Sequence, residues 1–385
     1  MNSAKTSCKE SARSASADTL NNGSNSSLRE TVAVTGASGC PDEQLLTLLT
    51  EHYNVIVLLD NGDRGLEARP DQTGHCPYVQ RRPCDLFSLP SAEKAMQDAD
   101  YAIYFVQPKR YPARLTQACS ADINAIQADH FARAACKNGI QHIAFLCSTA
   151  AGDVSPRSQL LSCLEIERIL GSYGLPVTTL RTGQNAKQTT AGAPGPSFQA
   201  PAALISAGKV LLDALVTAYR SGKPPGAPPD KGPSVKSKQV SDVRSIQRVV
   251  LPDNTDAAWA ARYYLDWLGS LLKLPVRIDH EGGDRYRICL RTGGLPILEL
   301  TRLQQQSDPQ HTMLRISGGV LAKQQDGYEG RLEFLQLPGS RECIIAIHDY
   351  LPSLPWVLYK HTQALVHLWV MAAFRRHLQR ISSRS

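Results

Sequence analysis

The N-terminal half of the chain takes its architecture from the stretch Thr31-Val32-Ala33-Val34-Thr35-Gly36-Ala37-Ser38-Gly39. Its first five residues form a β-branched, apolar run that is typical of a buried strand, and its glycines mark a tight turn. A leucine-rich, helix-like stretch follows, and then a second apolar run at 54–60. This order is that of a βαβ unit, whose strands are apolar throughout because helices cover both faces of a parallel sheet.

The alternation of strand and helix patterns continues for about 150 residues. It predicts further strands at 101–106, 140–146 and 177–181, and helices at 121–137 and 160–172. Five strands with intervening helices predict a doubly wound parallel α/β sheet, so we assign residues 31–183 to one domain.

A Pro/Gly-rich basic segment, residues 184–244, follows this domain and reads as a linker with one possible helix at 202–219. Its proline run, Pro224 to Pro229, cannot form a packed element. The Lys/Arg excess around this proline run, at 221–244, has no interleaved aromatics, so we expect no nucleic-acid binding and no attraction to anionic membranes.

Residues 245–385 have the pattern of a second, α+β domain. A strand at 246–251 and a helix at 256–272 precede several runs of period-2 alternation, and a long helix at 355–381 closes the chain. This is a helix-grip order. The four tryptophans of the chain all lie here, at Trp259, Trp267, Trp356 and Trp369. They indicate a second, separately packed core.

The composition excludes several protein classes. The chain has 385 residues, 42% hydrophobic and 20% charged, which suits two or three globular domains. Its richest apolar run, 364–374, is shorter than the roughly 18 residues that a transmembrane helix needs. Residues 1–30 are Ser/Asn-rich without an apolar core, which predicts a disordered leader and no signal peptide. We expect a cytoplasmic protein with no transmembrane segment.

Ten cysteines are scattered without a CxxC pair, so neither a zinc site nor a disulfide scaffold is predicted. We expect buried free thiols and no metal. Cys147 is the most interesting thiol, because it ends a predicted sheet strand. His348 and Asp349 are adjacent on a predicted strand, so they should face opposite sides and form no catalytic dyad, and a packed or solvated His348 is expected.

The turn Gly36-Ala37-Ser38-Gly39 lies between a strand and a helix, where glycines let the backbone approach a pyrophosphate and the helix N-terminus attracts it. Asp60 follows the next strand, 24 residues after Gly36. A carboxylate there accepts hydrogen bonds from an adenosine ribose and repels a 2′-phosphate, which favours NAD over NADP. The alternative is that Asp60 belongs to the turn Asp60-Asn61-Gly62.

Several motifs, in order, resemble those of the atypical short-chain dehydrogenase/reductases of the extended, NmrA-like or epimerase-like type. They are Thr35-Gly36-Ala37-Ser38-Gly39, Asp85-Leu86, Ala128-Asp129-His130-Phe131-Ala132-Arg133-Ala134-Ala135, and Leu164-Glu165-Ile166-Glu167-Arg168 with Gly174-Leu175-Pro176-Val177. The resemblance implies a Rossmann domain that binds NAD(P), with Asp85 and Leu86 on the adenine side. Residues 318–322 and 330–334 look like a START-like helix-grip domain, which implies a hydrophobic small-molecule ligand.

The chain departs from that family at functional positions. The third glycine falls at Asp42, after Pro41, and adds negative charge where two phosphates would lie. The Tyr-x-x-x-Lys pair falls at Gln159 and Cys163, neither of which can deliver a proton to a carbonyl or lower the pKa of a tyrosine.

The family's serine falls at Ser148 or Thr149, the weak catalytic candidates that remain. We therefore expect a non-catalytic or divergent dinucleotide sensor fused to a hydrophobic-ligand domain. Two alternatives stay open. One is an active NAD(P)-dependent oxidoreductase or nucleotide-sugar epimerase-like enzyme with non-standard residues, and the other is an interaction protein whose sheet domain is purely structural.

Overall fold

A computed structural model describes residues 29–35, 43–59, 77–106, 115–148, 156–182, 242–271, 276–326 and 328–383. The predicted leader, apart from its last two residues, and the possible helix at 202–219 lie outside these ranges. The chain divides into two units. Unit 1 comprises Met1–Pro108 and Gln127–Gly232, and unit 2 comprises Lys109–Ile126 and Pro233–Ser385.

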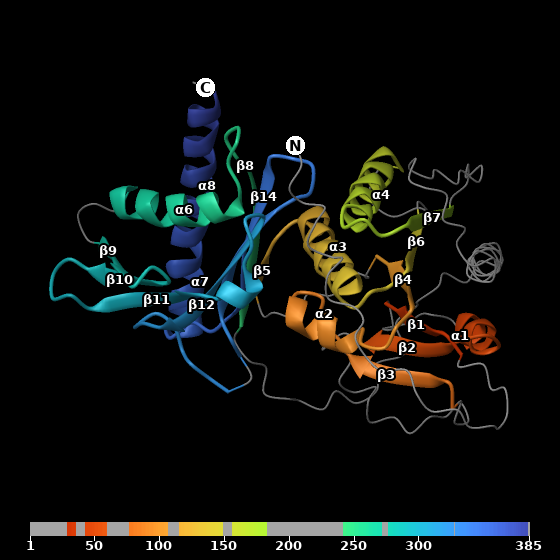
Figure 1. Ribbon diagram of the computed structural model, residues 1–385. Coiled ribbons are helices and arrows are strands. Elements are labelled where there is room, and N and C mark those ends of the chain that lie inside the picture. The colour runs from red at the N-terminus through yellow and green to blue at the C-terminus, as the bar shows by residue number, and fades with distance from the viewer. Residues whose placement is uncertain are drawn as a thin grey trace, which may run out of the picture. The chain divides into compact units, whose positions relative to one another are not determined.

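Unit 1 is a parallel α/β sheet with flanking helices (Figure 1). Its elements are β1 (Thr31–Val34), α1 (Glu43–Thr50), β2 (Asn54–Leu59), β3 (Val79–Pro83), α2 (Leu89–Ala95), β4 (Tyr101–Phe105), most of α3 (Ser120–Lys137), β6 (His142–Ser148), α4 (Pro156–Gly171) and β7 (Val177–Thr182). The strand order is β3-β2-β1-β4-β6-β7, and every neighbouring pair is parallel. The predicted doubly wound, Rossmann-like sheet is confirmed, with β3 as a strand beyond the five read from apolar runs.

Helices cover both faces of this sheet, as the apolar strands require. On one face, Val32 and Val34 of β1 share a buried cluster with Leu49 of α1. On the other face, Tyr104 of β4 packs against Phe131 of α3, with ring centroids 4.8 Å apart.

Unit 2 is an eight-stranded sheet with helices. Its elements are β5 (Leu115–Gln117), β8 (Val243–Val250), α6 (Ala257–Leu271), β9 (Val276–Glu281), β10 (Arg285–Leu290), β11 (Pro296–Arg302), the 3-10 helix η2 (Gln304–Gln306), β12 (His311–Gly318), β13 (Arg331–Gln336), β14 (Glu342–Tyr350), α7 (Trp356–His361) and α8 (Gln363–Ser382). The order is β5-β8-β14-β13-β12-β11-β10-β9, antiparallel except for the parallel edge pair β5–β8. Residues 109–126, which the sequence placed in the first domain, belong to this unit.

The second core that the tryptophans predict is present and is aromatic: Trp267 is buried in it and Trp259 and Trp356 pack against it, whereas Trp369 is exposed. Tyr264 and Trp267 of α6 meet Phe374 of α8 with centroid distances of 5.1 and 4.9 Å, and Phe334 of β13 lies 5.8 Å from Tyr264. The predicted closing helix is two helices, because Thr362 (φ −127°, ψ −80°) leaves the helical conformation between α7 and α8.

Gly319, just after β12, holds a turn that only glycine can form. Its φ is +108°, and a Cβ there would lie 2.4 Å from the Ile297 carbonyl oxygen and 2.5 Å from Leu298 Cα. Both strain and backbone overlap therefore exclude any side chain. Gly293 also has a positive φ, +83°, but open space surrounds it.

We predict that Gly319→Ala lowers the unfolding free energy of unit 2 by at least about 2 kcal/mol, whereas Gly293→Ala lowers it by about 1 kcal/mol. Urea titration followed by tryptophan fluorescence measures unit 2 alone, since the four tryptophans lie in it. Equal effects of the two variants would contradict the backbone overlap at Gly319.

Candidate functional site

The candidate ligand site of unit 1 lies at the carboxyl ends of β1 and β4, where the strand order reverses direction. Thr35, 1% exposed, joins the two strand ends. Its backbone N–H donates to the Ile103 carbonyl at 3.0 Å, and its Oγ1 accepts the Phe105 N–H at 2.8 Å. The turn that follows β1 therefore starts from a fixed position at this switch point.

The predicted phosphate turn itself, and several other predicted site residues, lie outside the described residues. These are Gly36, Ala37, Ser38, Gly39, Pro41, Asp42, Asp60 and Thr149. The structure fixes their flanks: β1 ends at Val34, α1 starts at Glu43, and β2 ends at Leu59. Ser148 is the last residue of β6 and pairs in register with Thr182 of β7, so it lies at the same carboxyl edge.

Asp85 and Leu86 follow β3 and build the turn into α2. The Asp85 carboxylate accepts the Phe87 N–H at 2.9 Å, and the Asp85 N–H donates to Ser91 Oγ at 3.0 Å. The Leu86 carbonyl lies 2.9 Å from His130 Nδ1, which must carry the hydrogen because a carbonyl only accepts. Both residues thus have a structural role, and contact with an adenine remains a prediction.

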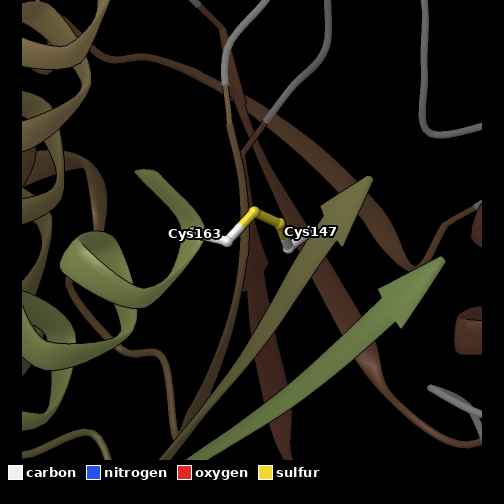
Figure 2. The surroundings of a disulfide bond; sticks show 2 residues. All are labelled: Cys147 and Cys163. Atoms are coloured by element: carbon white, nitrogen blue, oxygen red, sulfur yellow. A yellow bond between two sulfur atoms is a disulfide. The ribbon is translucent and has the colours of Figure 1, made fainter. Parts of the chain in front are cut away.

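Cys147 of β6 and Cys163 of α4 form a disulfide, with Cα atoms 6.2 Å apart (Figure 2). The prediction of free thiols is wrong for this pair, because a strand residue and a helix residue 16 positions apart meet across the layer. Five described cysteines lie outside any disulfide. Cys84, Cys289 and Cys343 are buried thiols, as predicted, whereas Cys136 is half-buried and Cys119 is exposed. Cys163 stands at the position of the family's lysine, and a disulfide sulfur has no proton to exchange.

Tyr104 on β4 is not a replacement proton donor in this arrangement. Burial raises the pKa of its phenol far above the usual range, and its ring packs against Phe131 and Phe145. Its hydroxyl has no hydrogen-bond partner among the described residues, and the side chain is fully buried. A phenol with so high a pKa is a poor acid near neutral pH, and a buried one does not reach a substrate, so Tyr104 does not take the place of the missing proton donor.

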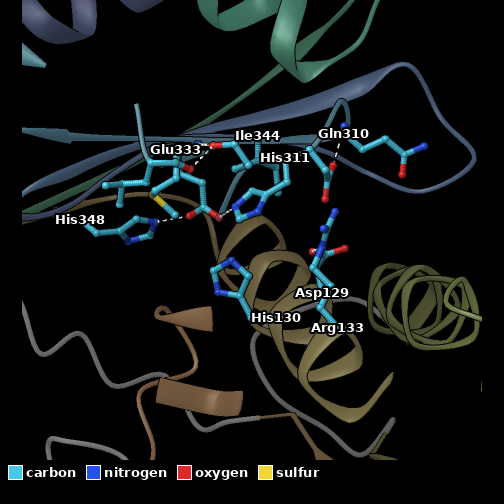
Figure 3. Close-up of polar contacts among 12 residues, drawn as sticks. Asp129, His130, Arg133, Gln310, His311, Glu333, Ile344 and His348 are labelled. Atoms are coloured by element: carbon cyan, nitrogen blue, oxygen red, sulfur yellow. Dashed lines mark hydrogen bonds and ion pairs between the residues drawn. The ribbon is translucent and has the colours of Figure 1, made fainter. Parts of the chain in front are cut away.

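Unit 2 contains a buried ionisable cluster that the sequence analysis did not find. Glu333 of β13 lies 2.6 Å from His311 Nε2 and 2.8 Å from His348 Nε2, and all three side chains are at most 1% exposed (Figure 3). Burial lowers the pKa of His348 to about 4, although the Glu333 hydrogen bond raises it. His348 is therefore neutral at pH 7, and its Nε2–H solvates the buried carboxylate. The prediction of a packed His348 is confirmed.

The neighbouring Asp349 binds different partners. Asp349 has a φ of 51° at an irregularity in the β14–β8 pairing, and its carboxylate lies 2.5 Å from Arg331 and 3.4 Å from Arg244. Burial acts to raise the pKa of Asp349, but these two guanidinium groups hold it below its usual value. His348 and Asp349 form no dyad with one another, as predicted.

The predicted apolar ligand of unit 2 has little room between α6, α8 and β13, because packed aromatic rings fill that space. Between α6 and strands β10 to β12 there is a cavity of about 10 Å³, the size of one water molecule. Residues that line it include Ala258, Ala261, Leu265, Tyr286 and Leu314.

No family model matches the chain. It is similar to the auxiliary protein GraX of Staphylococcus aureus, with 24% identity over 291 residues, which make up 76% of each chain.

Among solved structures, it is similar to Citrobacter triphenylmethane reductase with NADP(H) (20% identity, 39% of this chain, 48% of that chain, TM-score 0.30). It is also similar to a Staphylococcus aureus nucleoside-diphosphate-sugar epimerase (21% identity, 39% of this chain, 50% of that chain, TM-score 0.29). A third similar structure is that of an Escherichia coli NADPH-dependent quinone oxidoreductase with NADPH (20% identity, 40% of this chain, 48% of that chain, TM-score 0.29). The matches span about half the length of each solved chain.

We predict that peptides containing Cys147 and Cys163 remain cross-linked when the native protein is treated with iodoacetamide, and become alkylated only after reduction. Exposed Cys119 is the internal control, since it should react in both states. Mass spectrometry of the digests reads out each peptide. Alkylation of Cys147 without reductant would contradict the disulfide.

Unit 2 should lose stability as the pH falls from about 6.5 to about 4. Burial lowers the pKa values of both His348 and His367 to about 4, so in this range the unfolded state binds more protons than the folded state. Urea titrations at several pH values, followed by tryptophan fluorescence, measure the slope. His367→Gln should reduce it, and an unfolding free energy that is constant across the range would contradict the prediction.

Proposed function

We propose that unit 1 is a dinucleotide-binding domain that senses NAD(P)(H) without transferring hydride. The observation that carries this proposal is the place of Thr35, which follows β1 at the switch point of a doubly wound sheet and directly precedes the glycine-containing segment Gly36–Gly39 in the sequence. In open α/β sheets ligands bind in the crevice outside the strand ends at this point. The Thr35 contacts with β4 support the proposal, because they anchor the start of the turn.

The lack of hydride chemistry follows from the residues at the catalytic positions. Gln159 has no ionisable proton, and Cys163 is held in the disulfide. Ser148 alone can orient an oxygen but cannot transfer the proton that carbonyl reduction requires. The name of the similar Staphylococcus aureus protein describes an auxiliary protein, which agrees with a role outside catalysis.

The preference for NAD over NADP rests on Asp60, whose charge would repel a 2′-phosphate. Asp42 acts on both cofactors alike, because its carboxylate would lie near the pyrophosphate and weaken binding. The two carboxylates thus make separable contributions, one to specificity and one to affinity.

For unit 2 we propose the helix-grip type of domain. Its chain order, β8, α6, six antiparallel strands from β9 to β14, and then α8, supports this assignment. A hydrophobic ligand would have to displace aromatic rings that now pack against one another. We therefore assign a ligand to unit 1, the dinucleotide, and none to unit 2.

An active oxidoreductase or epimerase remains the alternative, and it would need a proton donor other than Gln159, Cys163, Ser148 and Tyr104. A purely structural unit 1 is the other alternative. It predicts no effect of any dinucleotide on stability, so one experiment separates it from the proposal.

We predict that saturating NADH raises the thermal unfolding temperature of unit 1. A ligand at about 100 times its Kd adds about 2.7 kcal/mol to the native state. NADPH should raise the unfolding temperature less than NADH does, and Asp60→Ala should reduce the difference between the two shifts. Asp42→Gly should tighten the binding of both dinucleotides. Differential scanning calorimetry measures the shift. No shift with any oxidised or reduced dinucleotide, in the wild type and in Asp42→Gly, would overturn the proposal.

A further inference from the structure

The C-terminal helices of unit 2 expose an apolar surface. Five of its side chains are 54 to 69% exposed, and we call them the α7–α8 apolar face: Val357, Leu358, Leu365, Val366 and Trp369. The opposite side of α8 is already packed, since Met371, Phe374 and Leu378 are at most 2% exposed. The exposed residues are therefore additional to those that hold α8 on the sheet.

The exposed side of α8 continues from apolar to basic along the helix. Arg376 and Arg380 lie 7 and 11 residues after Trp369, which places all three on one face, and both arginines are exposed. Leu365, four residues before Trp369, extends the same face at its apolar end. Exposed leucine and tryptophan side chains next to arginines are also the residue types by which helices bind membrane surfaces.

The charge of this region is of one sign. Residues 350–385 contain no Asp or Glu. They contain five cationic residues: Lys360, Arg375, Arg376, Arg380 and Arg384. A surface of this kind attracts anionic lipid headgroups, and the attraction grows with the number of Lys and Arg residues near the bilayer.

Charge also argues against other occupants of this face. The two longest segments of the chain outside the described part are themselves basic: residues 183–241 carry seven Lys/Arg and two Asp/Glu, and residues 1–28 carry three and two. Residues 60–76 are acidic, with four Asp/Glu and two Arg, but their one leucine, Leu66, is too little apolar surface to cover this face. A second copy would bring the same cationic helix end. Neither the two basic segments nor the same helix end of a second copy offers the negative charge that would complement the cations of the α7–α8 region.

We propose that the α7–α8 apolar face docks onto an anionic lipid bilayer. Leu365, Val366 and Trp369 enter the interface, where an indole ring is favoured, while Arg376 and Arg380 contact headgroups. No described helix is long and apolar enough to cross a bilayer. In this proposal α8 lies along the membrane surface, because its exposed apolar and basic residues share one face. This proposal is independent of the dinucleotide site.

Co-sedimentation of the full chain with vesicles tests the proposal. The protein should bind vesicles of equal parts phosphatidylglycerol and phosphatidylcholine, bind pure phosphatidylcholine at least about tenfold more weakly, and dissociate at about 0.5 M NaCl. The double variants Leu365→Ser/Trp369→Ser and Arg376→Glu/Arg380→Glu should each reduce binding at least about tenfold.

A matched control is Arg285→Glu/Arg315→Glu, which reverses two exposed charges on β10 and β12 and should leave most of the binding intact. Circular dichroism and thermal unfolding confirm that each variant folds. Equal losses in the control, equal binding to both vesicle types, or no binding would overturn the proposal. A wild-type dimer that Leu365→Ser/Trp369→Ser converts to a monomer would also overturn it, because the face would then join two copies.

Discussion

Parallel pairing of β1 with both β2 and β4 is the constraint on which unit 1 depends. Because all six strands run in the same direction, their carboxyl ends lie along one edge of the sheet. The chain continues from β1 to β2 and β3 on one side, and from β4 to β6 and β7 on the other, so the strand order reverses between β1 and β4. The residues that join strand ends, such as Thr35, and the turn built by Asp85 all belong to this edge. This edge therefore holds the polar groups from which we build the candidate ligand site.

Unit 2 meets a different constraint, since the middle of its sheet is buried on both faces. Leu332 and Phe334 face the aromatic core, but Glu333 between them is also fully buried. An unpaired carboxylate in such a place would cost several kcal/mol, and the two histidine Nε2–H groups supply the donors that it needs. The cluster thus explains how a charged residue occupies an interior strand, without any requirement for catalysis.

Local pattern predicted much of this structure. The βαβ unit, α3 and α6 follow from apolar periodicity, because each is long and strongly patterned. The short strand β5 was missed, since three residues carry no periodic signal and its partner β8 is more than one hundred residues away. The disulfide was missed for a related reason: spacing along the chain does not report which cysteines meet across a layer. Period-2 alternation predicts strands in this part of the chain but does not show that both faces of β13 are buried, so it gives no sign that Glu333 is a buried carboxylate.

The charge of the C-terminal region illustrates the same limit at the surface. The sequence shows that residues 350–385 contain Lys and Arg but no Asp or Glu. It does not show which of these side chains are exposed or which residues lie beside them. Once α8 is packed through Phe374 and Leu378, its outer side presents Leu365 and Trp369 in line with Arg376 and Arg380. Exposed apolar side chains are common on protein surfaces, and so are segments that contain Lys and Arg but no Asp or Glu. On one helix face they are complementary to a single kind of surface, one that offers an apolar layer beneath negative charge, and this is the physical description of an anionic bilayer.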